Sequence, residues 1–168
     1  MILQFFEWIS DNYLCDVRGW LSGGTSMHND AKRLLVAVSR AVGHKLDASD
    51  FNDRLTMQKG CYILNSWNYG PKYRYGLYIR GPYSSELADD YYEIKENIGN
   101  DTDIPEEVIA KLSSIFDKGL GYAEAYATVL LIKNNSPGAS YDSIHRRALE
   151  VKPHLESEIE EACSSILI

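Results

Sequence analysis

The sequence is poor in the features that mark a secreted, membrane-spanning or metal-binding protein. Only three of its 168 residues are cysteines, Cys15, Cys61 and Cys163. Their wide spacing matches no zinc or redox motif and favours reduced, buried thiols. No apolar run approaches the roughly 18 residues that span a bilayer, and the N-terminus lacks the pattern of a secretory signal. We therefore expect a cytoplasmic protein with no membrane partner.

Sequence signatures of catalysis are also missing. The chain has no GxSxG turn, phosphate-binding loop, GxGxxG fingerprint or HExxH pair. Its four histidines never recur at the three- or four-residue spacing that would put two metal ligands on one helix face. On a helix, the adjacent Asp89 and Asp90 would point about 100° apart, a poor geometry for a shared acid and base. We predict a non-enzyme with no catalytic residues, no metal site and no cofactor.

Charge is distributed unevenly along the chain, whose net charge is −7. Residues 54–85 contain five basic groups and no acidic one, whereas residues 86–109 contain nine acidic groups and one basic group. The basic groups are interleaved with aromatic side chains, a composition that can stack bases and follow phosphates. The acidic segment comes directly afterwards and would repel a nucleic acid unless it folded well away. Nucleic acid is therefore a disfavoured partner.

The spacing of apolar residues predicts a mainly α fold of seven to eight helices with one small β-hairpin. A chain of this length with 45% hydrophobic residues can fill one core. Gly60 costs its helix about 1 kcal/mol relative to alanine, which indicates a close neighbour. One helix should have Asp103 near its cap and Pro105 in its first turn. The expected helices cover 29–43, 54–67, 84–96, 101–116, 121–135, 140–151 and 152–168.

The first 26 residues differ from the rest of the chain. Residues 1–21 place apolar side chains at helical spacing, which predicts an amphipathic helix. Its acidic net charge favours a protein groove over an anionic membrane. Residues 22–26, SGGTS, have the composition of a flexible connector. Two interpretations are open: residues 1–26 are an appended or fused peptide before a single helical domain at 27–168, or they form an ordinary first helix docked on the core.

Residues 68–94 contain the most distinctive local pattern. Residues 68–82 alternate aromatic and polar side chains between glycines and prolines, which predicts a short strand or hairpin. After Gly81 and Pro82, either Ser84 or Ser85 is suited to cap the next helix, with Glu86 in its first turn. A hairpin that follows a helix also fits a winged-helix-like substructure.

Three motifs occur in order along the chain: RLTMQKGCYILN at 54–65, YIRGPYSSELADDYYEI at 78–94 and VKPHLESEIEEA at 151–162. Together they resemble motifs of the YwgA-like prokaryotic proteins and of the related SocA-like antitoxin domain, also called Panacea. The resemblance implies a mostly helical domain, and in the Panacea branch it implies an antitoxin that neutralises toxins by direct binding. The motif residues it implies are Gln58 and Lys59 on a helix and Gly81, Pro82, Tyr83, Ser84 and Glu86 at a turn.

These observations favour a protein-interaction module, antitoxin-like or regulatory, that binds a partner segment through a tyrosine-rich hairpin and groove. Tyrosine and arginine dominate the energetics of protein interfaces. We expect Gln58 and Lys59 to fix the turn by hydrogen bonding. The partner would be a toxin or a peptide segment, and residues 1–26 are one candidate for such a segment. The predicted partner-binding residues are Tyr75, Tyr78, Arg80, Tyr83 and Glu86, and the structural motif residues are Gln58, Lys59, Gly81, Pro82 and Ser84.

Two other functions stay open. A winged-helix regulator would bind DNA through the basic block at 54–85. A hydrolase or nuclease would bring its acidic residues together only in the folded protein.

Overall fold

The computed structural model describes residues 24–95 and 98–167, with side chains from residue 29 onward. Within these ranges the chain is mainly α-helical and contains one two-stranded antiparallel sheet, which confirms the predicted fold class. The predicted helix at 1–21 lies outside the described residues. The elements are α2 (Gly24–Val42), α3 (Phe51–Ser66), β1 (Gly76–Tyr78), β2 (Gly81–Tyr83), α4 (Ser85–Ile94), α5 (Glu106–Phe116), α6 (Leu120–Asn135), α7 (Tyr141–Val151), the 3-10 turn η1 (Pro153–Leu155) and α8 (Glu156–Leu167).

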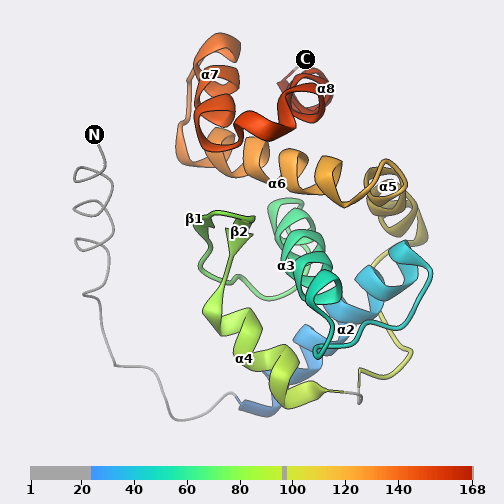
Figure 1. Ribbon diagram of the computed structural model, residues 1–168. Helices are drawn as coiled ribbons and strands as arrows, with labels where there is room; N and C mark the ends of the chain where they lie inside the picture. The colour runs from blue at the N-terminus through green and yellow to red at the C-terminus, as the bar shows by residue number, and fades with distance from the viewer. Residues whose placement is uncertain (1–23, 96–97, 168) are drawn as a thin grey trace.

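Helix α6 lies at the centre of the fold. Figure 1 shows α7 and α8 above it and α3 with the hairpin below it, and α6 contacts all of these elements. Its side chains are buried without interruption from Tyr122 to Ile132. A helix surrounded on all sides needs no polar stripe, which explains its even apolar composition.

Helix α2 begins earlier than predicted. The sequence predicts a start at Asn29 or Asp30, but the helix already includes Gly24, Thr25 and Ser26. The prediction that residues 22–26 form a flexible connector is therefore wrong for its last three residues. Glycine, serine and threonine are common in linkers, but they are also tolerated at a helix start, where the first four N–H groups need no intrahelical partner. Residues 22 and 23 lie outside the described residues.

Helix α3 begins at Phe51 rather than at residue 54. Its N-cap is Asp50, whose carboxylate accepts a hydrogen bond from the Asp53 backbone N–H at 2.9 Å. The predicted close neighbour of Gly60 is Val38 of α2. A Cβ atom at position 60 would lie 2.7 Å from Val38 Cγ1, closer than such atoms can approach. The absence of a side chain at Gly60 therefore lets the α3 backbone pack directly against the Val38 side chain of α2.

The predicted hairpin and capped helix are present, but Gly81 and Pro82 lie in strand β2 and not at a turn. Strand β1 pairs with β2 so that Tyr78 lies opposite Gly81, which leaves Ile79 and Arg80 as the two residues of the turn. Ser84 is the N-cap of α4, and its hydroxyl accepts from Leu87 N–H at 3.3 Å. The helix ends at Ile94, two residues before the predicted end.

Helix α5 differs from its prediction at the start. Pro105 is the N-cap residue and lies in extended backbone, so it precedes the helix instead of forming its first turn. Asp103 lies two residues earlier and makes no capping bond there. The prediction placed Pro105 one position too deep, because proline is compatible with both positions: neither needs its missing N–H group.

Two observations concern the cysteines and the membrane. Cys61 and Cys163 are fully buried thiols, and Cys15 lies outside the described residues. Burial raises the pKa of Cys163 to about 11, so this thiol is protonated at neutral pH. Among the helices that the structure describes, none is long and apolar enough to cross a bilayer.

Candidate functional site

The junction between β2 and α4 is held to α3 by one buried glutamine. The side-chain amide of Gln58 donates to the Ser84 carbonyl oxygen at 2.9 Å, and its oxygen accepts from the Ser84 N–H at 2.9 Å. Both residues are buried. Because an unpaired buried backbone group costs about 1–3 kcal/mol, this two-way contact fixes where the hairpin ends and α4 begins.

Gly81 is required by both its backbone and its surroundings. Its φ is +89°, a conformation that side chains other than glycine rarely adopt. A Cβ atom there would lie 3.3 Å from Thr128 Oγ1, 3.4 Å from Lys59 Cε and 3.5 Å from Glu124 Cγ. The turn therefore presses directly onto side chains of α3 and α6, and a larger residue at position 81 would push it outward.

A buried ion pair supports the turn from below. Lys152 lies between α7 and η1, and its ammonium donates to Glu124 Oε1 of α6 at 2.6 Å and to the Ile79 carbonyl oxygen at the tip of the hairpin. The Lys152 side chain is 0% exposed and that of Glu124 is 6% exposed. This contact joins the C-terminal helices to the hairpin, since one lysine bridges segments 73 residues apart in the sequence.

Lys59 lies in the same cluster but has a different environment. It is 2% exposed, yet within the described residues its ammonium makes no hydrogen bond or ion pair. Its pKa is lowered to about 8, chiefly by burial; the charge of Glu124 opposes this shift, and the charges of Lys152 and Arg80 add to it. The expectation that Lys59 fixes the turn by hydrogen bonding is thus not met. Lys152 donates to the hairpin instead, at the Ile79 carbonyl oxygen.

The outer face of the hairpin carries three of the predicted partner-binding residues. Tyr78 is 50% exposed and Tyr83 is 36% exposed, and their rings meet edge to face at 5.2 Å. Arg80 is exposed at the turn. Ile79, which the sequence does not single out, is 86% exposed. We call these four residues, Tyr78, Ile79, Arg80 and Tyr83, the hairpin tip.

The other two predicted partner-binding residues make contacts inside the protein. The Tyr75 hydroxyl donates to Asn65 Oδ1 at 3.0 Å, and its ring meets that of Tyr62 edge to face at 4.8 Å. Burial raises the pKa of Tyr75 well above its ordinary value. Glu86 is half-buried and pairs with Arg74 at 3.1 Å. These contacts favour a structural role for both residues, since they hold the start of the hairpin against α3 and α4.

Much of the basic block at 54–85 is engaged within the protein. Arg54 donates to the carbonyl oxygens of Ala48 and Ser49 at 2.9 and 2.8 Å. Lys59 is buried, and Arg74 pairs with Glu86. Strand β2, which a winged-helix reader of DNA would extend toward the duplex, packs on α3 and α6. The geometry therefore offers few free cations to a phosphate backbone.

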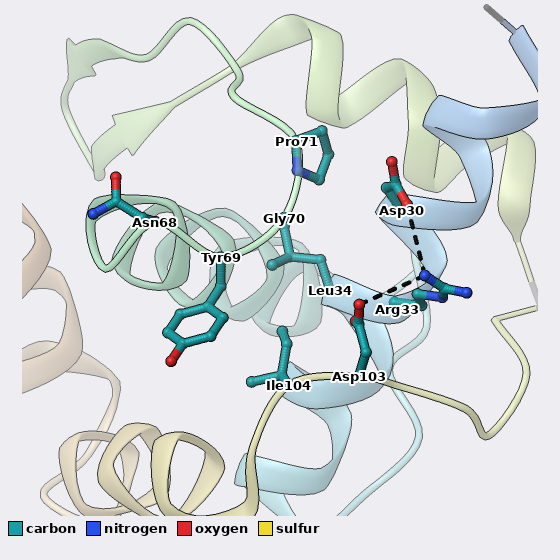
Figure 2. Close-up of a pocket in the computed structure, with 9 residues that line it drawn as sticks. All are labelled: Asp30, Arg33, Leu34, Asn68, Tyr69, Gly70, Pro71, Asp103 and Ile104. Atoms are coloured by element: carbon teal, nitrogen blue, oxygen red, sulfur yellow. Dashed lines mark ion pairs between the residues drawn. The ribbon is translucent and has the colours of Figure 1, made fainter.

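A separate pocket of about 390 Å³ lies between the start of α2, the loop that follows α3 and the loop that precedes α5 (Figure 2). Arg33 crosses its rim, 3.6 Å from an Asp103 oxygen and 4.0 Å from an Asp30 oxygen. None of the predicted site residues lines it, and its polar rim is already internally paired. Its lining residues are Asp30, Arg33, Leu34, Asn68, Tyr69, Gly70, Pro71, Asp103 and Ile104.

Sequence reasoning missed the three polar residues that surround the turn from below, Glu124, Thr128 and Lys152. Glu124 was detectable as the only acid within the apolar run of α6, because a charge on an otherwise buried helix usually has a partner. Lys152 belongs to the Lys-Pro motif at 151–162, whose position in the fold could not be inferred from the sequence. In the described part of the chain, no three histidine, cysteine or acidic side chains gather closely enough to hold a metal ion.

Comparison of this chain with protein-family models, with curated proteins and with solved structures finds no match. The resemblance to the YwgA-like and Panacea proteins therefore stays a prediction from three motifs. In the fold, those motifs lie together: Gln58 and Lys59 of the first, the turn of the second and Lys152 of the third meet at one corner.

Proposed function

We propose that this chain is a non-enzymatic protein-interaction module that presents the hairpin tip to a partner protein. The observation that carries the proposal is the distribution of exposed apolar side chains. Five large hydrophobic residues are exposed in the described part of the chain, and three of them, Tyr78, Ile79 and Tyr83, belong to the hairpin. Exposed apolar groups that gather on one small element are typical of binding surfaces, whereas scattered ones are ordinary.

The hairpin tip is also held rigidly, which favours recognition. A two-stranded hairpin with strands of three residues is barely stable by itself. Here Gln58 fixes its end and Lys152 fixes its turn, both through buried hydrogen bonds. A surface that is already ordered loses less conformational entropy when it binds, so its contacts contribute more to affinity.

The chemistry of the tip limits the kind of partner. Tyrosine rings and an isoleucine fit an apolar groove or helix face, and Arg80 adds a donor suited to a carboxylate. A partner segment with apolar side chains and at least one acidic group would match both features. The motif resemblance suggests a toxin or a regulated protein as the source of that segment, which would give this chain an antitoxin-like or regulatory role.

Site-specific photo-crosslinking tests the proposal. A benzophenone amino acid replaces Ile79 in the full chain, which is expressed in its natural host cells. Phe51, which is 53% exposed at the start of α3, provides the matched control position. We expect one discrete crosslinked protein from position 79 that is absent from position 51 and is reduced at least about tenfold by Arg80→Ala, the loss expected for a hot-spot residue.

Thermal unfolding of the same variants separates binding from folding, since Ile79 and Arg80 are exposed and their replacement should leave the unfolding temperature nearly unchanged. Equal crosslinked products from positions 51 and 79, or none from position 79, would show that the hairpin tip is not an interface.

A further inference from the structure

The two edges of the hairpin differ in what covers them. Strand β2 packs on α3 and α6, whereas β1 has β2 as its one close neighbour among the described elements. In Figure 1, β1 is accordingly the outer strand, and β2 lies nearer to α3. An uncovered edge strand is a template on which an extended segment of another chain can pair.

Pro82 determines which main-chain groups point to the uncovered edge. Opposite residues in an antiparallel pair of strands alternate between pairs that exchange both hydrogen bonds and pairs that exchange none. Leu77 lies opposite Pro82, and proline has no N–H group to donate. The two residues therefore form a pair without hydrogen bonds, and the N–H and C=O groups of Leu77 point away from β2.

The covered edge has no comparable group to offer. Main-chain direction alternates, so the groups on the far side of β2 belong to Pro82 and to Ser84 directly after the strand. Pro82 provides no donor, and both main-chain groups of Ser84 are bonded to Gln58 at 2.9 Å. On the β1 edge, no hydrogen bond from elsewhere in the described chain reaches the main chain of Leu77. An incoming strand thus finds both a donor and an acceptor at β1.

The ring of Tyr78 provides an apolar surface beside this edge. A Cβ atom at Gly76 would lie 2.8 Å from Tyr78 Cε2, so the ring folds back over Gly76. Tyr78 is nevertheless 50% exposed. A strand added to β1 would place an apolar side chain against this ring, and cross-strand contacts between aromatic and β-branched side chains stabilise sheets.

The charge around β1 favours an acidic occupant. Lys72, Arg74 and Arg80 are exposed before and after the strand, and residues 72–80 contain no acidic residue. Arg74 pairs with Glu86, but its side chain is still 82% exposed, and surface pairs of this kind contribute little. A second copy of this chain would bring the same cations against one another, which destabilises a sheet.

We propose that the outer edge of β1 binds an extended segment of the partner protein, which adds a third strand to the hairpin and directs acidic side chains toward Arg74 and Arg80. Main-chain hydrogen bonds to Leu77 would supply affinity, and the side chains would supply specificity. A helical segment cannot make these bonds, because its own N–H and C=O groups are used within the helix. This binding mode rests on the proposed function, since it describes how the partner reaches the hairpin tip.

A peptide titration tests strand addition without the natural partner. A short synthetic peptide in which glutamate and valine alternate is added to the ¹⁵N-labelled full chain. We expect a saturable shift of the Leu77 amide signal. A peptide of the same charge with proline at two adjacent central positions lacks a donor on each edge, and a third peptide has lysine in place of glutamate. Neither should give a saturable shift.

A main-chain substitution provides the sharpest variant. Replacing Leu77 by its α-hydroxy acid analogue turns the amide into an ester and removes the N–H group without changing the side chain. Affinity for the acidic peptide should fall about five- to tenfold, the loss expected for one hydrogen bond. Leu77→Val keeps the N–H group and should bind like the native chain.

Thermal unfolding checks that the hairpin survives in the ester variant. The Leu77 N–H makes no bond to β2, whereas Gly76 lies in a pair that exchanges hydrogen bonds with Tyr83. An ester at Leu77 should therefore lower the unfolding temperature less than an ester at Gly76. In the host cells, the ester at Leu77 should reduce the protein crosslinked from position 79 by a factor similar to the loss of peptide affinity.

The possible outcomes separate this binding mode from the proposed function. If position 79 gives no crosslinked protein, the proposed function fails, and the peptide titration still decides whether β1 accepts a strand. An undiminished crosslinked product from the ester variant, or equal binding of the proline-containing peptide, would overturn strand addition while the hairpin tip remained an interface. Equal binding of the lysine peptide would overturn the acidic assignment. A dimer of the free chain that the ester abolishes in analytical ultracentrifugation would assign the edge to a second copy instead.

Discussion

Helix α3 contacts α2 and the hairpin in opposite ways. Toward α2, Gly60 packs against the methyl groups of Val38, and the contact is entirely apolar. Toward the hairpin, Gln58 and Lys59 meet a turn through hydrogen bonds and buried charge. When an apolar contact is altered, the protein loses stability in proportion to the buried area and volume that change. When one partner of a buried polar contact is removed, the other partner is left unsatisfied, and the full desolvation cost appears at once. The same helix should therefore respond very differently to substitution on its two sides.

The largest expected effect is on the polar side. Lys152→Met would preserve most of the side-chain volume but leave the Glu124 carboxylate buried without its partner and the Ile79 carbonyl without its donor. Breaking a buried pair in this way typically costs about 3–5 kcal/mol. Urea unfolding of the variant should show this loss in the free energy of unfolding, with the midpoint moving to lower urea.

Two further variants separate the buried charge from the loss of packing. Adding Glu124→Gln to Lys152→Met removes the stranded carboxylate charge and should restore a large part of the stability. Lys72→Met, at an exposed position of the same basic block, should change stability by no more than about 0.5 kcal/mol. A loss below about 1 kcal/mol for Lys152→Met would show that the pair does not hold the corner together.

The next effect is a dependence on pH that comes from Lys59. Its pKa falls from 10.5 in the unfolded chain to about 8 in the fold, so the unfolded state binds more protons between these values. The cost of burying the charged ammonium is therefore fully present below pH 8 and is relieved as the pH rises toward 10.5. Compared with Lys59→Met, the native chain should gain on the order of 2 kcal/mol between about pH 7.5 and 9.5.

This difference must be measured as native chain minus variant at each pH. The buried tyrosines Tyr73 and Tyr75 have raised pKa values, and they act in the opposite direction, because their stabilisation is lost as the pH rises above about 10. They are present in both proteins and cancel in the subtraction. Parallel curves for the two proteins would mean that Lys59 keeps its ordinary pKa, and the buried-charge description of the corner would then be wrong.

Sequence patterns predicted the apolar side of this comparison better than the polar one. Helical spacing gave the order of the helices, and the cost of Gly60 correctly indicated a close neighbour. Such signals are local, because the pattern and the contact lie on the same helix. The helix cap at Ser84 or Ser85 was predicted for the same reason, because capping is a property of a few consecutive residues, and the structure has Ser84 as the cap.

The polar contacts around the hairpin could not be predicted from any local pattern in the sequence. The pairing of Lys152 with Ile79 joins residues 73 positions apart, and Glu124 comes from a third segment. Tyr75 illustrates the same limit: composition grouped it with Tyr78, yet only the fold shows that its hydroxyl bonds to Asn65. Residues of one type in one stretch can therefore face inward or outward. The alternation at 68–82 did not separate them, because residues 68–75 form no regular strand whose two faces the alternation would mark.

The smallest expected effect is on the apolar side, at Gly60. Gly60→Ala should favour the helix by about 1 kcal/mol, but the new methyl group would lie 2.7 Å from Val38 Cγ1 and force that side chain to move. Overpacking of this kind costs about 1–3 kcal/mol, so a net loss of about 1 kcal/mol is expected in urea unfolding. Adding Val38→Ala, which opens space at the same point, should remove the clash and make the double variant more stable than the sum of the single effects. If the two stability changes simply add, the side chains at positions 38 and 60 are not in contact. An apolar contact of this kind can relax through the motion of one side chain, so the loss of stability should be small, and a second substitution at the neighbouring position should reverse it. The removal of Lys152 differs, because it leaves the buried Glu124 charge, which packing alone cannot satisfy.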